Sequence, residues 1–211
     1  MENIKRESIK RYQFTFGVPV FETKLGLSHD MKENMSNYLS NCHDVQKHRT
    51  NVKATMTSYF VHKQNDDIKN LSDIVFKYIG EMTNYTTNTN IGSEPSLLFT
   101  SEVWGGIYTT GEETILHNHN PFLWSWCYYL KIPDGSSPLV FPESNIIFEP
   151  QEDELIIFPS YAGHMVPPCS FDGKRIMIAG NVGLDAKGYL NTKFEGEHII
   201  NVPQDKFIPF E

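Results

Sequence analysis

The sequence is poor in cysteine and in positive charge. Its three cysteines form no C-x-x-C pair, and an odd number does not suit a disulfide scaffold, so we expect a reducing compartment. Lys and Arg number 18 against 26 Asp and Glu, which gives a formal net charge of -8. This balance argues against a nucleic-acid partner, because phosphate backbones are bound by clustered Lys and Arg.

Long apolar runs are also missing. No stretch of about 18 apolar residues is present to cross a membrane, and the N-terminal MENIKRESIKRYQF lacks the apolar core of a signal peptide. We therefore expect a cytoplasmic protein without a membrane partner. The basic residues between Lys5 and Arg11 are interpreted as a solvated end rather than as a nucleic-acid arm.

The remaining composition is that of a globular protein, with 39% hydrophobic and 13% aromatic residues. A length of 211 residues suits a single domain with one site. We divide it into an N-terminal strand and supporting helices (1–95), a jelly-roll core that carries the site (96–190) and a C-terminal tail (191–211).

The N-terminal part has a β-type segment and two helical patterns. Residues 14–26 favour an opening strand with a kink. An N-cap at Ser28 and apolar residues at helical spacing predict a helix over about 29–40. A longer apolar stripe after Asn65 predicts a second helix, and the polar run 84–90 is expected to be a loop.

From Pro95 onward, short runs of β-forming residues alternate with turn residues, as in a sandwich or barrel. The expected strands are 97–104, 114–117, 124–132, 138–141, 146–148, 154–158, 164–167 and 175–184. The fold class is therefore mainly β with N-terminal helices, a double-stranded β-helix (jelly-roll) barrel buttressed by helices.

Three histidines carry the strongest chemical signal. Residues i and i+2 of a strand point to the same face, so His117 and His119 converge. His164 follows an apolar strand and supplies a third ligand if that strand is a neighbour. Three ligands on one side of a metal leave positions open for reactants. The alternative is that these histidines are ordinary core or surface residues. We assign structural roles to the others, His29, His43, His48, His62 and His198.

Arg175 is the second candidate. The turn residues between His164 and Arg175 let the chain reverse and place Arg175 beside the His164 strand. An arginine inside a barrel is costly unless it meets an anion, and its guanidinium suits a carboxylate. The alternative is an arginine that pairs with an acidic neighbour or points into solvent.

Residues 104 to 184 resemble the 2-oxoglutarate- and Fe(II)-dependent dioxygenases, close to the prolyl-hydroxylase branch and to a poorly characterised bacterial and phage group. The resemblance lies in seven short motifs that occur in the same order and at similar spacing. They are His117-x-His119, Trp126–Leu130 (WCYYL), Leu139–Glu143 (LVFPE), Phe148–Pro150 (FEP), Leu155–Phe158 (LIIF), His164 and Arg175.

This resemblance implies an enzyme with Fe(II) as cofactor and 2-oxoglutarate as co-substrate. His117 and His164 would be metal ligands, Arg175 would pair with the distal carboxylate of 2-oxoglutarate, and Tyr129 would hydrogen-bond the same carboxylate. The implied reaction hydroxylates a C–H bond and releases succinate and CO2. Asn181 stands where the bacterial group also has Asn, without an assigned role. For a phage-encoded protein, the expected location is the host cytoplasm.

His119 departs from the family pattern, which has a carboxylate at this position. It is either the third ligand, as in the predicted set His117, His119 and His164, or a neighbour of the metal that leaves a position to water. A neutral imidazole leaves one more positive charge at the iron than a carboxylate does, which favours an anionic co-substrate and changes the redox potential.

Several alternatives stay open at this point. A three-histidine dioxygenase of cupin type would use no 2-oxoglutarate and would need no paired arginine. A non-catalytic metal-binding jelly-roll module would have a filled pocket. The substrate is a peptidyl or prolyl residue or a small metabolite. The sequence does not distinguish a monomer from a homodimer. Residues 41–51 form either a lid or a surface loop, and residues 207–210 dock on a neighbour or on their own core. Four aromatic residues either line the pocket or pack in the core: Trp104, Tyr108, Trp124 and Trp126.

Overall fold

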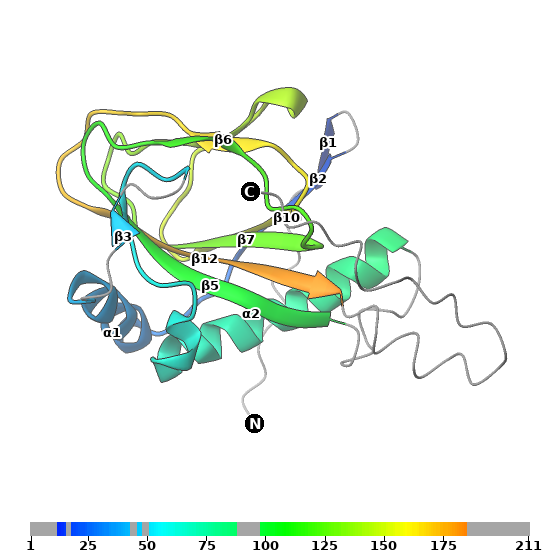
Figure 1. Cartoon of the computed structure of the whole chain (residues 1–211), viewed down its shortest axis with the longest axis horizontal. Coiled ribbons are helices and arrows are strands. Elements are labelled where there is room, and N and C mark those ends of the chain that lie inside the picture. The colour runs from blue at the N-terminus through cyan, green and yellow to red at the C-terminus, as the bar shows by residue number, and fades with distance from the viewer. Residues whose placement is uncertain (1–11, 16–17, 43–45, 48–50, 88–97, 185–211) are drawn as a thin grey trace, which may run out of the picture.

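The computed structural model describes residues 12–15, 18–42, 46–47, 51–87 and 98–184 (Figure 1). Within these ranges the elements are β1 (Tyr12–Thr15), β2 (Val18–Lys24), α1 (His29–Ser40), β3 (Gln46–Lys47), β4 (Thr55–Met56), η1 (Val61–Lys63), α2 (Asp66–Thr87), β5 (Leu98–Tyr108), β6 (Thr114–His117), β7 (Trp124–Lys131), β8 (Leu139–Phe141), η3 (Pro142–Ser144), β9 (Ile146–Phe148), β10 (Glu154–Pro159), β11 (His164–Val166) and β12 (Arg175–Leu184).

The strands form two sheets. The main sheet has the order β1-β2-β10-β7-β12-β5-β4-β3, and the second sheet has the order β6-β11-β8-β9. Figure 1 shows α1 and α2 on one side of the main sheet and β6 on the other side. This helix-backed pair of antiparallel sheets confirms the predicted jelly-roll class. No helix among the described residues combines the length and the apolarity needed to span a membrane.

The two faces of the main sheet serve different layers, as β7 shows. Its residues Trp126 and Tyr128 belong to the apolar cluster that includes α1 and α2. The alternate residues Cys127 and Tyr129 belong to a second cluster, which lies between the two sheets. Because successive side chains of a strand point to opposite faces, one strand contributes to both layers.

Both helices begin where the sequence predicts. The backbone N–H of Met31 donates to Ser28 Oγ at 3.3 Å, and that of Ile68 donates to Asn65 Oδ1 at 3.0 Å. The second helix is longer than expected, because residues 84–87 of the predicted loop are helical. The hydroxyl of Thr86 donates to Met82 O at 2.9 Å, so a polar side chain finds its partner inside the helix.

Helix α1 lies close to the main sheet because of a glycine. A Cβ at Gly105 would overlap the side chain of Leu39 in α1. The sheet therefore presents bare backbone at the point where Leu39, which is 1% exposed, packs.

One N-terminal prediction needs correction. The segment 14–26 does not form one kinked strand, because β1 and β2 are separate strands that pair with each other in an antiparallel ladder. In addition, β2 pairs with β10 and β4 pairs with β5, so the N-terminal part extends the main sheet at both edges. Such long-range pairing leaves no local sequence signal.

Strand β5 runs to Tyr108, beyond the predicted end at 104, because it pairs with β12 along its whole length despite Gly105 and Gly106. The other predicted strands agree with the structure to within one residue at each end. Much of the 41–51 segment and all of 207–210 lie outside the described residues.

Candidate metal centre

The three candidate histidines lie together in the space between the sheets. His117 ends β6, His164 begins β11, and the two are register partners in the antiparallel pair of these strands. His119 lies in the loop two residues beyond β6. The ligand atoms of the three side chains all lie within 4.8 Å of one another, which suits coordination of one metal ion.

Backbone carbonyls orient two of the three rings. Nδ1 of His117 lies 2.9 Å from the oxygen of Ile115, and Nδ1 of His164 lies 2.9 Å from the oxygen of Ala162. A carbonyl only accepts, so Nδ1 carries the proton in each ring and Nε2 has the free lone pair that a metal requires. The ring of His119 instead packs against Trp104, with 5.6 Å between ring centroids.

The imidazoles are held in the neutral form. Burial, together with the charge that protonated His164 or His117 would carry, lowers the pKa of His119 from 6.5 to about 3. Burial and the neighbouring His117 lower the pKa of His164 to about 4. The pKa of His117 is also lowered, mainly by burial. Neutral imidazoles are the ligand form for a divalent metal.

Arg175 lies in the same cavity and has no anionic partner among the residues that the structure describes. Its side chain is 1% exposed, and its Nε and Nη1 make no hydrogen bond with a described residue. The guanidinium carbon lies 4.8 Å from the ring centroid of Tyr108 and 5.2 Å from that of Tyr129. The hydroxyl of Tyr129 is likewise buried without a hydrogen-bond partner. Two unsatisfied donor side chains thus stand side by side.

The acidic protons near Arg175 do not supply the missing anion. Burial raises the pKa of the Cys127 thiol to about 12, although Arg175 opposes this shift. Burial also raises the pKa of the phenols of Tyr108 and Tyr129 above 10, so these groups stay neutral. A buried guanidinium among neutral groups therefore calls for an anion from outside the chain.

A single cavity connects the histidines to Arg175. It encloses about 430 Å³, part of which is open to solvent, and none of the described residues that line it is acidic. Its lining joins the three histidines with Arg175, Tyr108, Tyr129, Ser125, Trp104 and Trp126. A metal ion and a guanidinium in one such cavity suit a dianion that can bind the metal with one end and the arginine with the other.

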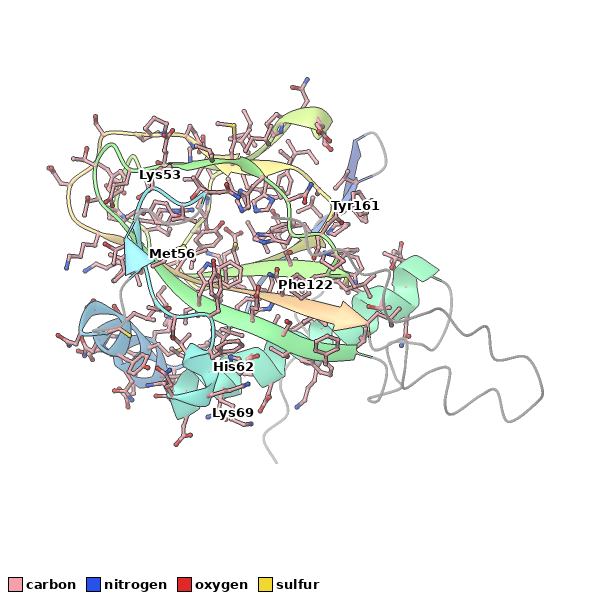
Figure 2. The ribbon with its side chains drawn as sticks, viewed as in Figure 1. Lys53, Met56, His62, Lys69, Phe122 and Tyr161 are labelled. Carbon is pink, nitrogen blue, oxygen red and sulfur yellow. The ribbon has the colours of Figure 1, made fainter. Side chains whose placement is uncertain are left out.

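Three of the four aromatic candidates line the cavity, namely Trp104, Tyr108 and Trp126. Trp124 does not line the cavity, and its Nε1 donates to Thr83 Oγ1 at 2.8 Å. Among the other histidines, Figure 2 places His62 on the helix side, away from the cavity. The side chain of His29 at the start of α1 is exposed and lies 3.5 Å from Glu33. His43, His48 and His198 lie outside the described residues.

A buried polar cluster next to the site was not predicted. It consists of Ser125, Ser160, Asn181 and the partly buried Glu102. The available signal was a serine inside the otherwise apolar run WSWCYYL, together with Asn181 in RIMIAGN. Polar residues on buried strands have partners, but the sequence does not say which ones.

Comparison with known proteins gives structural matches alone. No protein-family model and no curated protein matches the sequence. The viral collagen prolyl hydroxylase of Paramecium Bursaria Chlorella virus-1, in complex with 2-oxoglutarate, superposes with a TM-score of 0.58 at 14% identity, over 77% of this chain and 94% of that one. A prolyl-4-hydroxylase of Pseudomonas putida gives 0.54 at 15% identity, over 78% and 91%. HygX of Streptomyces hygroscopicus, with nickel, 2-oxoglutarate and hygromycin B bound, gives 0.53 at 10% identity, over 78% and 82%.

The chain therefore has the fold of the 2-oxoglutarate- and Fe(II)-dependent oxygenases and lies structurally near the prolyl hydroxylases. This agrees with the resemblance that the seven sequence motifs indicated.

Proposed function

We propose that the protein is an Fe(II)- and 2-oxoglutarate-dependent dioxygenase, which hydroxylates a peptidyl or prolyl residue or a small metabolite and releases succinate and CO2. The observation that carries this proposal is Arg175, a buried cation in the cavity that the three histidines line, whose Nε and Nη1 make no hydrogen bond with a described residue. Burying an unpaired charge costs several kcal/mol, about as much as a whole side chain of core packing. A carboxylate ligand offsets this cost.

The donors in the cavity fit both ends of 2-oxoglutarate. Arg175 and the hydroxyl of Tyr129 would bind its distal carboxylate, because both have unused hydrogen-bond donors. The three imidazoles would hold Fe(II), through Nε2 in His117 and His164. Bound Fe(II), 2-oxoglutarate and O2 would together supply the oxidising chemistry.

The chain's own part is to orient these groups and to keep water away. Phe158 packs edge-on against His164, with 4.7 Å between ring centroids, and Phe141 lies at 5.9 Å. Both phenylalanines are 1% exposed. His164 is therefore backed by buried apolar rings that keep water from this side of it, which strengthens the attraction between charges there.

The substrate remains open between a peptide and a small molecule. The neighbours from the Chlorella virus and from Pseudomonas putida are prolyl hydroxylases, whereas HygX has hygromycin B bound. The formal net charge of -8 argues against a nucleic-acid substrate. We place the protein in the cytoplasm, because its cysteines suit a reducing compartment.

A three-histidine dioxygenase without 2-oxoglutarate is the second candidate. It is favoured by His119, because a neutral imidazole replaces the carboxylate of the family pattern. It gives no reason for a buried, unpaired Arg175 beside the metal site. A non-catalytic module is less well supported, since it gives no reason for the buried Nε and Nη1 of Arg175 to lack hydrogen bonds with the described residues that line the cavity.

An anaerobic Fe(II) titration with and without 2-oxoglutarate tests the proposal. We expect a weak visible metal-to-ligand charge-transfer band that needs both components and that weakens strongly in Arg175→Ala. Lys174→Ala is the matched control, because this neighbouring cation is exposed and should leave the band unchanged. Bound Fe(II) without such a band in the wild type would contradict the 2-oxoglutarate assignment and favour the second candidate.

A further inference from the structure

A row of polar side chains crosses the cavity face of the main sheet. Glu102 on β5, Asn181 on β12 and Ser125 on β7 are successive register partners across three adjacent strands. Ser160 follows β10, the next strand in the sheet. Ser125, Ser160 and Asn181 are at most 2% exposed, and all three have hydrogen-bond partners.

The direction of every hydrogen bond in this row is determined. Nδ2 of Asn181 donates to Glu102 Oε2 at 3.0 Å, and the hydroxyl of Ser125 donates to Asn181 Oδ1 at 2.8 Å. A hydroxyl has one proton, so the 2.8 Å contact between the two serine hydroxyls has Ser160 as its donor. The carboxylate at one end thus orients the amide, the amide orients Ser125, and Ser125 orients Ser160.

The same row ends at the backbone of a candidate metal ligand. The carbonyl oxygen of Ser160 accepts from His119 N–H at 2.8 Å, and the N–H of Ser160 donates to Leu123 O at 3.1 Å. Ser160 therefore holds both ends of the loop from His119 to Leu123. The rings of His117 and His164 are each oriented by the backbone carbonyl of the residue two positions earlier, and these carbonyls lie on a strand or next to one. The position of His119 instead depends on this loop and on its packing against Trp104.

We propose that Ser125, Ser160 and Asn181, anchored by Glu102, are positioning residues that place His119 as the third metal ligand. The inference rests on the proposed function, because it requires the three-histidine metal centre. It assigns a role to Asn181, whose side chain hydrogen-bonds to Ser125 and Glu102 rather than to a histidine. The row sets the geometry of the ligand that replaces the family's carboxylate.

Titration of the metal-free protein with Co(II) alone, followed by its visible d–d absorption, tests this role. We expect Ser125→Ala to raise the Co(II) dissociation constant about tenfold and to change the spectrum, as loss of a supporting interaction around a metal ligand does. Ser160→Ala, which removes the next hydroxyl of the row, should act in the same direction. If one of these two variants does not fold, the other one alone is sufficient for the test.

Thr83→Val is the matched control. The Thr83 hydroxyl is also 2% exposed or less and accepts from Trp124, the residue before Ser125, but on the helix side of β7. Its loss should lower the melting temperature about as much as Ser125→Ala does and leave Co(II) binding unchanged. A merely structural row would give these two variants the same Co(II) affinity and the same spectrum.

A double-mutant cycle identifies the histidine through which the row acts. In the His119→Ala background, Ser125→Ala should cause no further loss of Co(II) affinity. An equal loss in both backgrounds, or wild-type affinity in Ser125→Ala, would overturn the inference while the metal centre stands. Wild-type protein that binds no Co(II), or His119→Ala that binds it as tightly as wild type, would overturn the three-histidine centre and the inference with it.

Discussion

The two faces of the main sheet differ in how their polar atoms are used. On the helix side, Tyr128 donates to Asp153 at 2.6 Å, and Trp124 donates to Thr83, so the polar atoms of these buried aromatic residues are paired. On the cavity side, Tyr129 and Arg175 keep buried donors without partners. At these positions the helix side has its polar atoms satisfied, whereas the cavity side carries a cost that a ligand would remove.

The largest expected effect is on the helix side. Leu155 on β10 is fully buried in the cluster that α1 and α2 complete. Leu155→Ala should lower the free energy of unfolding by about 2–5 kcal/mol, because it removes buried surface and leaves a cavity. Urea denaturation measures this change.

Metal binding by the same variant tests whether the two faces are independent. The folded fraction of Leu155→Ala should bind Co(II) as the wild type does, since Leu155 faces away from the histidines. A variant that loses stability and Co(II) affinity together would show that the two faces are not independent.

Acid should act through the cavity side. The pKa values of His119 and His164 are lowered from 6.5 to about 3 and about 4 in the folded protein. In the unfolded chain both histidines have a pKa near 6.5. Below this pH they are protonated in the unfolded state but stay neutral in the folded state. The free energy of unfolding of the metal-free protein should therefore be highest above pH 6.5 and should fall as the pH drops towards 4. At pH 5 the expected loss is about 2 kcal/mol per histidine.

His119→Asn isolates this effect, because the difference from wild type cancels the contribution of His62 on the helix side, whose pKa is also lowered. Urea denaturation of metal-free protein at pH 7 and pH 5 should show a smaller loss for the variant. Equal losses would mean that His119 is not buried in the neutral form.

Local patterns in the sequence predicted most of the elements and the site. Both helices have an apolar stripe and a side-chain N-cap, and the strands of the core lie between turn residues, so each carries its signal within a few residues. His117 and His164 were predicted as ligands from motifs, and the structure makes them register partners. Arg175 and Tyr129 were predicted to bind a carboxylate, which stays a prediction.

Features that depend on distant segments were not predictable in the same way. The pairing of β2 with β10 joins residues more than a hundred positions apart. The hydrogen bond from Asn181 to Glu102 spans 79 positions, and that from Ser125 to Asn181 spans 56. Their partners are fixed by strand order and register, which local periodicity does not encode.

Removing the charge of Arg175 should have a smaller effect on stability, with the opposite sign. Arg175→Met keeps the length of the side chain and removes a buried cation whose Nε and Nη1 make no hydrogen bond with a described residue. In the absence of ligand, the variant should be more stable than wild type by about 1 kcal/mol or more, because buried charges are often replaced by apolar groups with a gain. Thermal unfolding without ligand measures this.

The same variant should lose the response to 2-oxoglutarate. Wild-type protein with metal should be stabilised by added 2-oxoglutarate, and Arg175→Met should not be. Loss of stability in the unliganded variant would indicate that Arg175 has a structural partner, and the cavity side would then resemble the helix side.

The smallest effects separate two adjacent tyrosines. Tyr128→Phe removes a hydroxyl that donates to Asp153, so it should lower the free energy of unfolding by about 1 kcal/mol and leave 2-oxoglutarate affinity unchanged. Tyr129→Phe removes an unpaired hydroxyl, so stability should stay the same or rise slightly. Its 2-oxoglutarate affinity should fall about tenfold, the equivalent of one hydrogen bond of about 1.4 kcal/mol to a charged acceptor. Calorimetric titration with metal present, beside urea denaturation without it, gives both quantities. Because the two residues are neighbours on β7, a reversed result would mean that the paired face binds the ligand and the unpaired face does not.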